Sequence, residues 1–495
     1  MYKPTRGQGT IFEDISVFSD IKLDPENRWV KMAALIPWDT LDAMYAKTFK
    51  GKDTGNPGKS SRMALGSLII QTKLSISDVE TRQMIMENPY LQWFVGLPYY
   101  SYEPPFDAST MVSFRKRITP EMIEMVNEAI IQGTVKKQET AEFPEDSDDQ
   151  DSDGKDGDDK PNSGTLILDA TCAPSDIAFP TDVSLLSKAR ELTETMIDEL
   201  HSHRQAKKKP RTYRKVARQK YLRFARNRRP SRKLIRQAVK SQLGFVGRNL
   251  KHIETLLSEG LELSELSIQK LETVNKLYLQ QLEMYENQVH SIPDRIVSLD
   301  QPWVRPIVRG KSKARTEFGA KVAISLVDGF ARIEKLSWNA FNEAGTFIES
   351  VERYYGIHGC YPERVLVDMI YRNSANRGYC KSKGILMSGR KLGRPPSDPE
   401  IRKQQNLEER AQSGQRNAVE GKFGEAKRRY GLDLLMARRQ DTCETSIHMV
   451  FLVMNLAKRL RLFLLPSFRN LQFHAKNFFY TLTGSYGKKW KMARI

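Results

Sequence analysis

The stretch Thr165-Leu166-Ile167-Leu168-Asp169 is a short apolar run that ends in an acid, and Arg364-Val365-Leu366-Val367-Asp368 repeats this pattern much later in the chain. A short apolar run of this length predicts a buried β-strand. A single acid at the end of a strand ordinarily forms only a turn. Two such stretches predict neighbouring strands of one sheet, each of which brings a carboxylate to the same edge.

The sequence between and after these stretches predicts the rest of that fold. Lys321–Leu326 and Ala331–Leu336 flank Asp328-Gly329, which is a strong signal for a β-hairpin. The pattern also predicts helices over 345–355, 375–383 and 414–429 and a short strand over 384–387. The resulting order is strand, hairpin, helix, strand, helix, strand, helix. It is the order of an RNase H-like α/β domain, in which helices flank a mixed sheet.

Three acids of this predicted domain are candidates for metal chemistry. Asp169 and Asp368 end the two strands, and Glu420 lies in the middle of the helix over 414–429. Hard carboxylate oxygens suit Mg²⁺ or Mn²⁺. Two such ions in one active site would activate the attacking oxygen and stabilise the leaving oxygen in phosphodiester chemistry. Asp294 and Asp300 flank a further predicted strand over 295–299, but neither lies where the fourth strand of the domain would end.

The charge of the chain points to a polyanion as partner. The 495 residues contain 79 Lys and Arg against 60 Asp and Glu, a net charge of +19. Arg204–Arg236 contains 16 Lys or Arg and no acid. Helical spacing puts Tyr213, Val216, Ala217, Tyr221 and Phe224 on one face and leaves the cations on the others. A solvated face is the plain alternative, but so dense a run favours binding to phosphate backbones through Lys208, Arg211, Arg214, Arg218, Arg226 and Arg229.

A second charged segment has the opposite sign. Glu145–Asp159 has nine acids and one lysine. Such a composition cannot bury enough apolar surface to fold, so it predicts a disordered linker. The alternative is an acidic strand that mimics DNA and occupies a basic groove when substrate is absent.

The sequence argues against membrane, secreted and cysteine-rich classes. No window approaches the length of apolar sequence that a spanning helix needs, and the first residues have no apolar core of a secretory signal. The four cysteines lie far apart and form no CxxC, which argues against a disulfide framework and a cysteine zinc site. We therefore expect a cytoplasmic protein that binds a polyanion and no membrane.

These patterns divide the chain into five predicted parts. Residues 1–140 form a helical N-terminal DNA-binding domain, with helices over 62–74, 77–87 and 120–132. Residues 141–164 form the acidic linker, 165–190 with 291–465 the catalytic domain, 191–290 a basic helical insertion, and 466–495 an aromatic and basic tail. A helix-turn-helix-like unit and a plain helical bundle fit the first part equally well. Further predicted DNA contacts are Arg115, Lys116 and Arg117, and Lys391 and Arg394 in a Gly/Pro-rich loop.

The chain resembles bacterial insertion-sequence DDE transposases of the group that contains insertion-sequence families four and five. Leu168–Pro174 with Phe179–Asp182 resembles the strand of the first Asp, and Val367–Asn373 with Asn376-Arg377 resembles the segment of the second. Arg416, Glu420 and Lys427 match the family's R-x3-E-x6-K signature. Asp107–Thr110, followed by Phe114–Arg117, resembles its helical domain. The resemblance runs from about residue 40 to 465, and only the combination of motifs is specific.

The resemblance implies a function and roles for these residues. Asp169, Asp368 and Glu420 would be metal ligands, and Arg416 and Lys427 would hold DNA phosphates near them. In the family, water activated by metal cuts at the terminal inverted repeats of the element, and the freed 3′-OH attacks target DNA. Synapsis of two ends makes a homodimer the expected assembly, and the resemblance also implies double-stranded DNA as the partner and a bacterial, nucleoid-associated location. No covalent protein–DNA intermediate is implied.

The sequence departs from the family at one position and leaves other functions open. Family four has a tyrosine three residues before the signature arginine, and Ser413 stands there instead, which puts a hairpin route in doubt. A transposase-derived DNA-binding protein without transposition activity is one alternative function. A structure-selective RNase H-like nuclease is the other.

Overall fold

A six-stranded mixed sheet lies at the centre of the computed structural model, which describes residues 23–49, 57–133, 161–202, 208–308, 316–389, 393 and 398–463. Its strands are β1 (Thr165–Pro174), β2 (Arg305–Val308), β3 (Thr316–Val327), β4 (Phe330–Ser337), β5 (Arg364–Leu366) and β6 (Leu386–Met387). β1 is antiparallel to β3 and parallel to β5, and β5 is parallel to β6. β2 and β4 both pair with β3. The predicted mixed α/β fold is confirmed.

The hairpin between β3 and β4 has the turn that its sequence predicts. Asp328 and Gly329 have φ values of 50° and 71°. Positive φ at both central residues defines the type I′ turn, whose twist matches that of the flanking strands. The hairpin prediction is therefore confirmed at the level of its turn.

Both faces of the sheet are covered by helices, and alternate residues of β1 enter different cores. Leu166 and Leu168 pack with Phe347 and Val351 of α13 (Phe347–His358). Ile167 shares the opposite core with residues of α15 (Pro399–Tyr430) and of the helical segment 440–463. Alternation of this kind is what a strand buried on both faces requires. Smaller elements complete this part: η1 (Glu343–Thr346), η2 (Met369–Tyr371) and α14 (Ser374–Ser382).

The N-terminal helices share their core with the C-terminal segment. They are α2 (Arg28–Ala33), α3 (Trp38–Ala46), α4 (Ser61–Leu74), α5 (Asp78–Glu87), α6 (Pro89–Phe94), α7 (Thr110–Arg117) and α8 (Pro120–Gln132). The three helices expected in this region are confirmed. Asn455, in the segment 440–463, donates from Nδ2 to Asn127 Oδ1 of α8 at 2.8 Å and accepts from the backbone N–H of Ala331 at 3.0 Å. One cluster of buried residues runs from Leu23 to Leu460.

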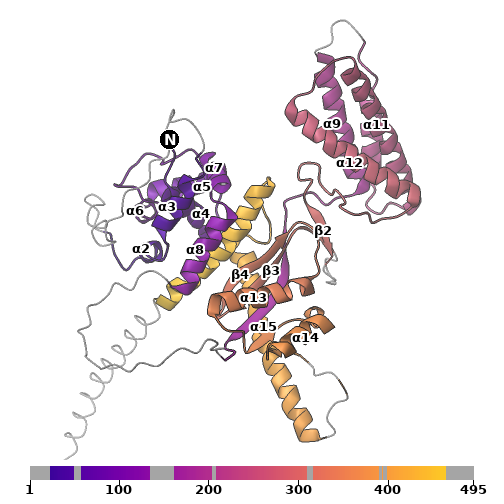
Figure 1. Ribbon diagram of the computed structural model, residues 1–495. Coiled ribbons are helices and arrows are strands. Elements are labelled where there is room, and N and C mark those ends of the chain that lie inside the picture. Colours follow the sequence, from indigo (N-terminus) through magenta and orange to yellow (C-terminus); the bar gives the residue numbers. More distant parts are fainter. Residues whose placement is uncertain are drawn as a thin grey trace, which may run out of the picture.

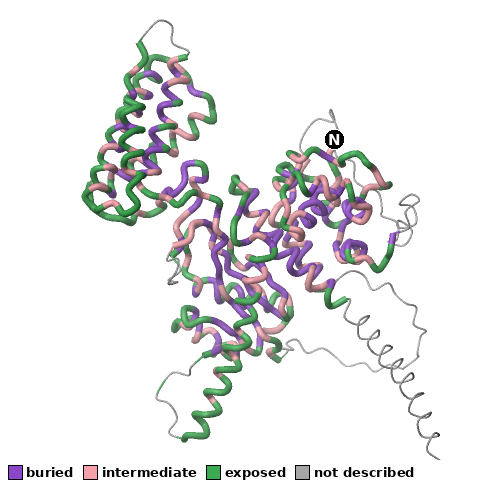
Figure 2. The backbone as a smooth tube through the Cα atoms, turned by 180° about the vertical axis from the view of Figure 1, so that it is seen from behind, coloured by how far each residue is buried: buried purple, intermediate pink, exposed green. Residues whose placement is uncertain are grey.

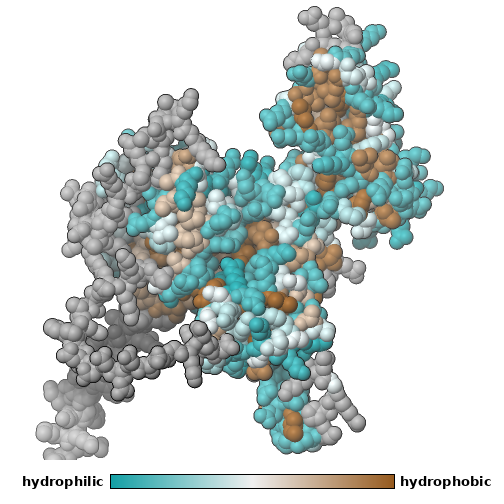
Figure 3. Space-filling view, in the orientation of Figure 1, coloured by the Kyte–Doolittle hydropathy of each residue, from teal (hydrophilic) through white to brown (hydrophobic). Residues whose placement is uncertain are grey.

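A helical bundle between β1 and β2 has cores of its own. It consists of α9 (Asp182–Ser202), α10 (Arg214–Ala225), α11 (Arg232–Ser258) and α12 (Glu265–Asn287), and it projects away from the sheet (Figure 1). Gly260, at the turn between α11 and α12, has a φ of 84°. The buried side chains of the bundle form two clusters separate from the cores of the sheet. Buried positions run along the inner faces of its helices, and apolar patches lie among hydrophilic side chains on its surface (Figures 2 and 3).

Three sequence expectations differ from the structure. Residues 295–299 form no strand, because they lie in the irregular link that returns from α12. The helix of Glu420 begins at Pro399 rather than near 414, because Asp398 caps it by accepting from the backbone N–H of Glu400 at 2.9 Å. The helix α9 crosses the expected boundary at residue 190, since Val183, Leu186 and Ala189 already pack in the bundle.

Some predictions lie outside the described residues. These are the acidic segment 145–159, Lys391, Arg394 and the tail 466–495. Within the described residues, no helix combines the length and the apolar character that crossing a membrane requires.

Candidate active site

A cleft of about 690 Å³ at one edge of the sheet brings together five predicted site residues. They come from the strand β1, the end of β5 and the helix α15, and they are Asp169, Asp368, Arg416, Glu420 and Lys427. Asp169 is far from the other four residues in sequence. Parallel pairing of β1 with β5 aligns Ile167 with Leu366, so Asp169, which lies inside β1 and not at its end as predicted, comes beside Asp368 just beyond β5.

Asp169 is the least exposed of the three acids. It pairs with Ile324 across the β1–β3 ladder, and its Oδ1 accepts a hydrogen bond from the backbone N–H of Ala170 at 2.8 Å. Burial raises the pKa of Asp169 to about 6, the Ala170 hydrogen bond opposes this rise, and the nearby Glu343 carboxylate adds to it. A carboxylate desolvated in this way favours a cation beside it.

Asp368 follows β5 directly and caps η2. Its Oδ1 accepts from the backbone N–H of Met369 at 2.8 Å, and its side chain is 55% exposed. The preceding residue is fixed by Ser388, whose hydroxyl accepts from the backbone N–H of Val367 at 2.9 Å. The cap and this bond set the direction in which the carboxylate leaves the sheet.

The helix α15 supplies both acid and cations to the cleft. Arg416, Glu420, Phe423, Gly424 and Lys427 line it, at the spacing that places residues on one helical face. The guanidinium of Arg416 lies between two carboxylates, 3.9 Å from Asp368 Oδ1 and 3.9 Å from Glu420 Oε1. Arg416 thus links the second and third predicted acids as their shared counter-ion.

Two cleft residues were not predicted from the sequence. Glu343 opens η1, and its Oε1 lies 2.9 Å from Nζ of Lys321 on β3. Lys321 also donates to the backbone carbonyl of Phe341 at 2.8 Å. An acid at the start of a helix is common because it favours the helix dipole, so Glu343 carried no separate signal. Its position became evident only when η1 was seen to lie at the cleft.

The cleft acids have the donor type of a hard divalent cation, but they do not meet around one point. Within the described part of the chain, no three His, Cys, Asp or Glu side chains are grouped closely enough to hold one ion. Arg416 stands between Asp368 and Glu420 and balances their charge. The carboxylate oxygens suit Mg²⁺ or Mn²⁺ in type. The predicted metal site therefore remains a prediction.

The predicted cations of α7 are partly engaged in structure. Arg115 pairs with Asp78 and donates to Gln71 at 2.8 Å. Arg117 donates to the backbone carbonyl of Thr48 at 3.1 Å, whereas Lys116 is exposed. A DNA-contacting role stays a prediction for all three, and Lys116 is the one whose side chain faces solvent.

The predicted cations of the bundle are mostly exposed. Tyr221 and Phe224 of α10 pack against the bundle core and Ala217 is buried, whereas Tyr213 and Val216 are exposed. Arg214 pairs with Asp198 at 2.8 Å. The remaining predicted cations face solvent, namely Lys208, Arg211, Arg218, Arg226 and Arg229. The helical face expected for α10 is thus confirmed for three of its five residues, and its cations are available to a partner.

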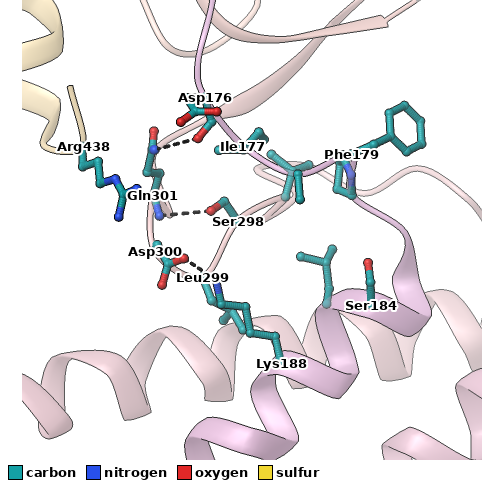
Figure 4. A pocket seen from close by; sticks show the side chains of 14 residues that line it. Asp176, Ile177, Phe179, Ser184, Lys188, Ser298, Leu299, Asp300, Gln301 and Arg438 are labelled. Carbon is teal, nitrogen blue, oxygen red and sulfur yellow. Dashed lines mark hydrogen bonds and ion pairs between the residues drawn. The ribbon is translucent and has the colours of Figure 1, made fainter. Parts of the chain in front are cut away.

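A second pocket lies where the bundle joins the sheet, and it holds one of the alternative acids (Figure 4). Asp300 pairs there with Lys188, which keeps this carboxylate away from the candidate active site. The amide of Gln301 donates to the backbone carbonyl of Asp176 at 3.4 Å. Asp294 has its backbone carbonyl bonded to Gln280 and does not line the candidate active site either. Asp368 is thus the acid at the end of the strand next to β1.

Comparisons with known proteins agree with this geometry. Residues 365–457 match the family described as "Transposase DDE domain", and residues 17–117 match "Transposase domain (DUF772)". The chain is 28% identical over 190 residues to "Uncharacterized protein ORF8 in nfe locus" from Rhizobium meliloti, an alignment that covers 38% of this chain and 81% of that protein. No solved structure matches the chain. The resemblance to DDE transposases is confirmed, with Asp368, Arg416, Glu420 and Lys427 inside the first matched region.

Proposed function

Because this chain carries the sequence of a transposase DDE domain, we propose that it is the DNA-cutting and DNA-joining enzyme of an insertion sequence. It binds the terminal inverted repeats of the element and hydrolyses phosphodiester bonds at the element ends. It then transfers the freed 3′-OH to target DNA. The catalytic part would have the RNase H-like fold, a proposal that the strand order β4-β3-β1-β5-β6 supports.

One observation carries this proposal: acids from three separate elements line the same cleft together with two cations. Asp169, Asp368 and Glu420 are the acids, and Arg416 and Lys427 are the cations. Phosphodiester chemistry needs negative side chains to hold metal ions and positive side chains to hold the phosphate. A cleft that held only a structural ion pair would not need the additional acids.

Asp169, Asp368 and Glu420 would hold the divalent ions, two for each active site. When bound, Mg²⁺ or Mn²⁺ activates the attacking oxygen and stabilises the leaving oxygen of an in-line displacement. The desolvated carboxylate of Asp169 supports this role, because burial raises its pKa and a neighbouring cation would relieve that cost. Glu343, held by Lys321, adds a fourth acid to the same cleft.

The cations of α15 would position the DNA strand. Arg416 presents a planar guanidinium that can bind phosphate oxygens in pairs, and Lys427 lies three turns of the helix further along the same face. In the absence of DNA, Arg416 contacts Asp368 and Glu420. It therefore orients the two acids before a phosphate enters.

The α9–α12 bundle would clamp flanking or terminal DNA and contribute to a homodimer in the complex of two ends. The exposed cations on and around α10 support the first part of this proposal. Each phosphate that a cation neutralises releases counterions, so such a clamp would bind DNA strongly at low salt and weakly at high salt.

The test uses a labelled duplex that carries the repeat flanking the gene, together with Mg²⁺ or Mn²⁺. Wild type is compared with Asp169→Ala, Asp368→Ala and Glu420→Ala. Cleavage at the repeat boundary that is lost in all three variants would establish the proposed activity and the proposed site together. The reaction contains both element ends, so that a complex of two ends can assemble.

Other outcomes would favour the alternative functions. Tight binding to the repeat without cleavage would point to a transposase-derived DNA-binding protein. Cleavage without preference for the repeat would point to a structure-selective nuclease. Cleavage that survives in the three variants would contradict the assignment of the site.

A further inference from the structure

Six cations and two acids gather on a surface outside the candidate active site. This basic cluster surrounds Glu425 and lies where the N-terminal helices α2 and α4 meet α15 and the segment 440–463. Its members are Arg28, Lys73, Lys422, Arg429, Lys458 and Arg461. Asp328 also acts on Lys458, so six cations and two acids leave a net charge of +4.

Glu425, one of the two acids of the basic cluster, pairs with two of its cations. Lys422 Nζ lies 3.0 Å from Glu425 Oε2, and Arg461 Nη2 lies 3.5 Å from Glu425 Oε1. Glu425 is only 16% exposed, whereas Arg461 is 61% exposed. Arg28 and Arg429 are also exposed. Three of the six cations of the basic cluster are therefore exposed to solvent.

The cations of the basic cluster repel one another. Burial lowers the pKa of Lys73, and Arg28, Arg429 and Arg461 lower it further. Burial likewise lowers the pKa of Lys458, and Lys422 adds to the effect. Repulsion of this kind destabilises the folded protein, unless a polyanion neutralises the charge.

The helix α15 contributes residues to both the basic cluster and the candidate active site. Glu420 and Lys427 of α15 face the cleft, whereas Lys422, Glu425 and Arg429 follow one another at helical spacing on a different face. A helix rises about 1.5 Å per residue, so Arg429 lies roughly 13 Å along the axis from Glu420. The basic cluster therefore lies on the far side of α15 from the cleft and would hold a stretch of DNA other than the one at the catalytic acids.

We propose that the basic cluster binds the sugar–phosphate backbone of duplex DNA outside the catalytic cleft, without reading its sequence. The cations come from four helices and spread over a surface, which suits an extended polyanion better than a single small anion. The proposal rests on the proposed function for the identity of that polyanion. It adds to that function a phosphate-binding surface built jointly by the N-terminal and C-terminal parts of the chain.

The test measures binding of the full chain to a duplex of arbitrary sequence, without divalent metal, as a function of salt concentration. The variant carries Arg28→Gln, Arg429→Gln and Arg461→Gln, all at exposed positions, so that folding is preserved and thermal unfolding can verify it. The control variant carries Lys335→Gln, Lys381→Gln and Lys403→Gln, which removes the same charge from exposed positions outside both the basic cluster and the bundle.

We expect the cluster variant to bind about tenfold or more weakly and its salt dependence to be shallower by about 2–3 on a double logarithmic plot, since each phosphate contact contributes about 0.9. The control variant should change both quantities much less. Equal losses in the two variants, or an unchanged salt dependence in the cluster variant, would overturn the proposal. Because no cleavage is measured, this outcome is independent of whether the protein is an active transposase.

A second measurement locates the contact on DNA. Single phosphates of a cleavable duplex are replaced, one at a time, by uncharged methylphosphonates. We expect a subset of replacements to weaken binding of the wild type and of the control variant, but not of the cluster variant, because the lost partner is already absent. If the same replacements weaken all three proteins equally, no phosphate lies on the basic cluster and the proposal fails.

Discussion

The candidate active site and the α9–α12 bundle are built in opposite ways. The cleft lies on a sheet whose core continues into the N-terminal helices and the C-terminal segment, so distant parts of the chain fix its geometry. The bundle interrupts this arrangement between β1 and β2, and its buried side chains form separate clusters. The acids thus depend on a shared core for their precise placement, whereas the exposed cations need only stably folded helices that present them to solvent.

The largest expected effect concerns the cleft alone. Glu420→Gln should lower DNA cleavage by at least about a thousandfold, because a metal-holding carboxylate is lost. Binding of uncut DNA and the melting temperature should stay near wild type, since the Glu420 side chain is 62% exposed. Gel-based cleavage assays measure the first quantity and calorimetry the last. Glu408→Gln, at an exposed position on the same helix, is the matched control; comparable cleavage by both variants would remove Glu420 from the site.

Substitution of one buried asparagine in each core compares the stability of the two cores directly. Asn455→Ala should lower the free energy of unfolding by about 2–3 kcal/mol, because it removes the partner of the Ala331 backbone N–H and of Asn127 Oδ1 and one of the two donors to the Ala331 carbonyl. Asn249→Ala in the bundle removes one hydrogen bond, to Thr193 Oγ1 at 3.0 Å, and should cost about 1 kcal/mol.

The two asparagine variants should also affect different parts of the molecule. Separate cores favour separate unfolding units, so hydrogen exchange should increase in the N-terminal helices and the sheet for Asn455→Ala and in α9–α12 for Asn249→Ala. Uniform changes across the whole chain in both variants would contradict the independence of the bundle.

The exposed cations of the bundle should matter for DNA and not for folding. Arg218→Gln, Arg226→Gln and Arg229→Gln together should weaken DNA binding about tenfold at moderate salt. The melting temperature should not change, since all three side chains are exposed. Filter binding over a series of salt concentrations measures the effect. Affinity equal to wild type at every salt concentration would show that the bundle does not hold DNA.

The smallest expected effect is a change of the protein's stability with pH that arises from Asp169 in the cleft. Burial raises the pKa of Asp169 from 3.8 to about 6, so the native state binds more protons than the unfolded state between these values. The contribution of Asp169 to stability therefore falls as the pH rises from about 4 to 6, by about 1 kcal/mol after allowance for solvent screening. In metal-free protein, Asp169→Asn should remove this decline and be the more stable form at pH 7. Denaturation curves of both proteins at pH 4 and pH 7 measure this difference in stability. A wild type that gains stability relative to Asp169→Asn as the pH rises would contradict the prediction.

The sequence predicted the elements of the cleft better than the packing around it. The apolar runs before Asp169 and Asp368 predicted two strands that do form, but β1 continues past Asp169 to Pro174, and β5 ends at Leu366, before Asp368. Glu343 was missed, because its role depends on where η1 lies against the sheet. The pairing of Arg115 with Asp78 was missed for the same reason. The core shared by the N-terminal helices with residues 440–463 joins segments at opposite ends of the sequence, and no local pattern encodes such contacts.

The joint between the bundle and the sheet has a consequence for engineering. Gln301 bonds to the backbone of Asp176 although 125 residues separate them, so the chain leaves the sheet and returns to it at nearly the same place. The bundle is therefore an insertion whose two ends lie close together at the sheet. The entropy of closing a loop grows only with the logarithm of its length. Replacement of residues 182–296 by a short Gly/Ser linker should thus leave the strand register intact and yield a minimal catalytic unit.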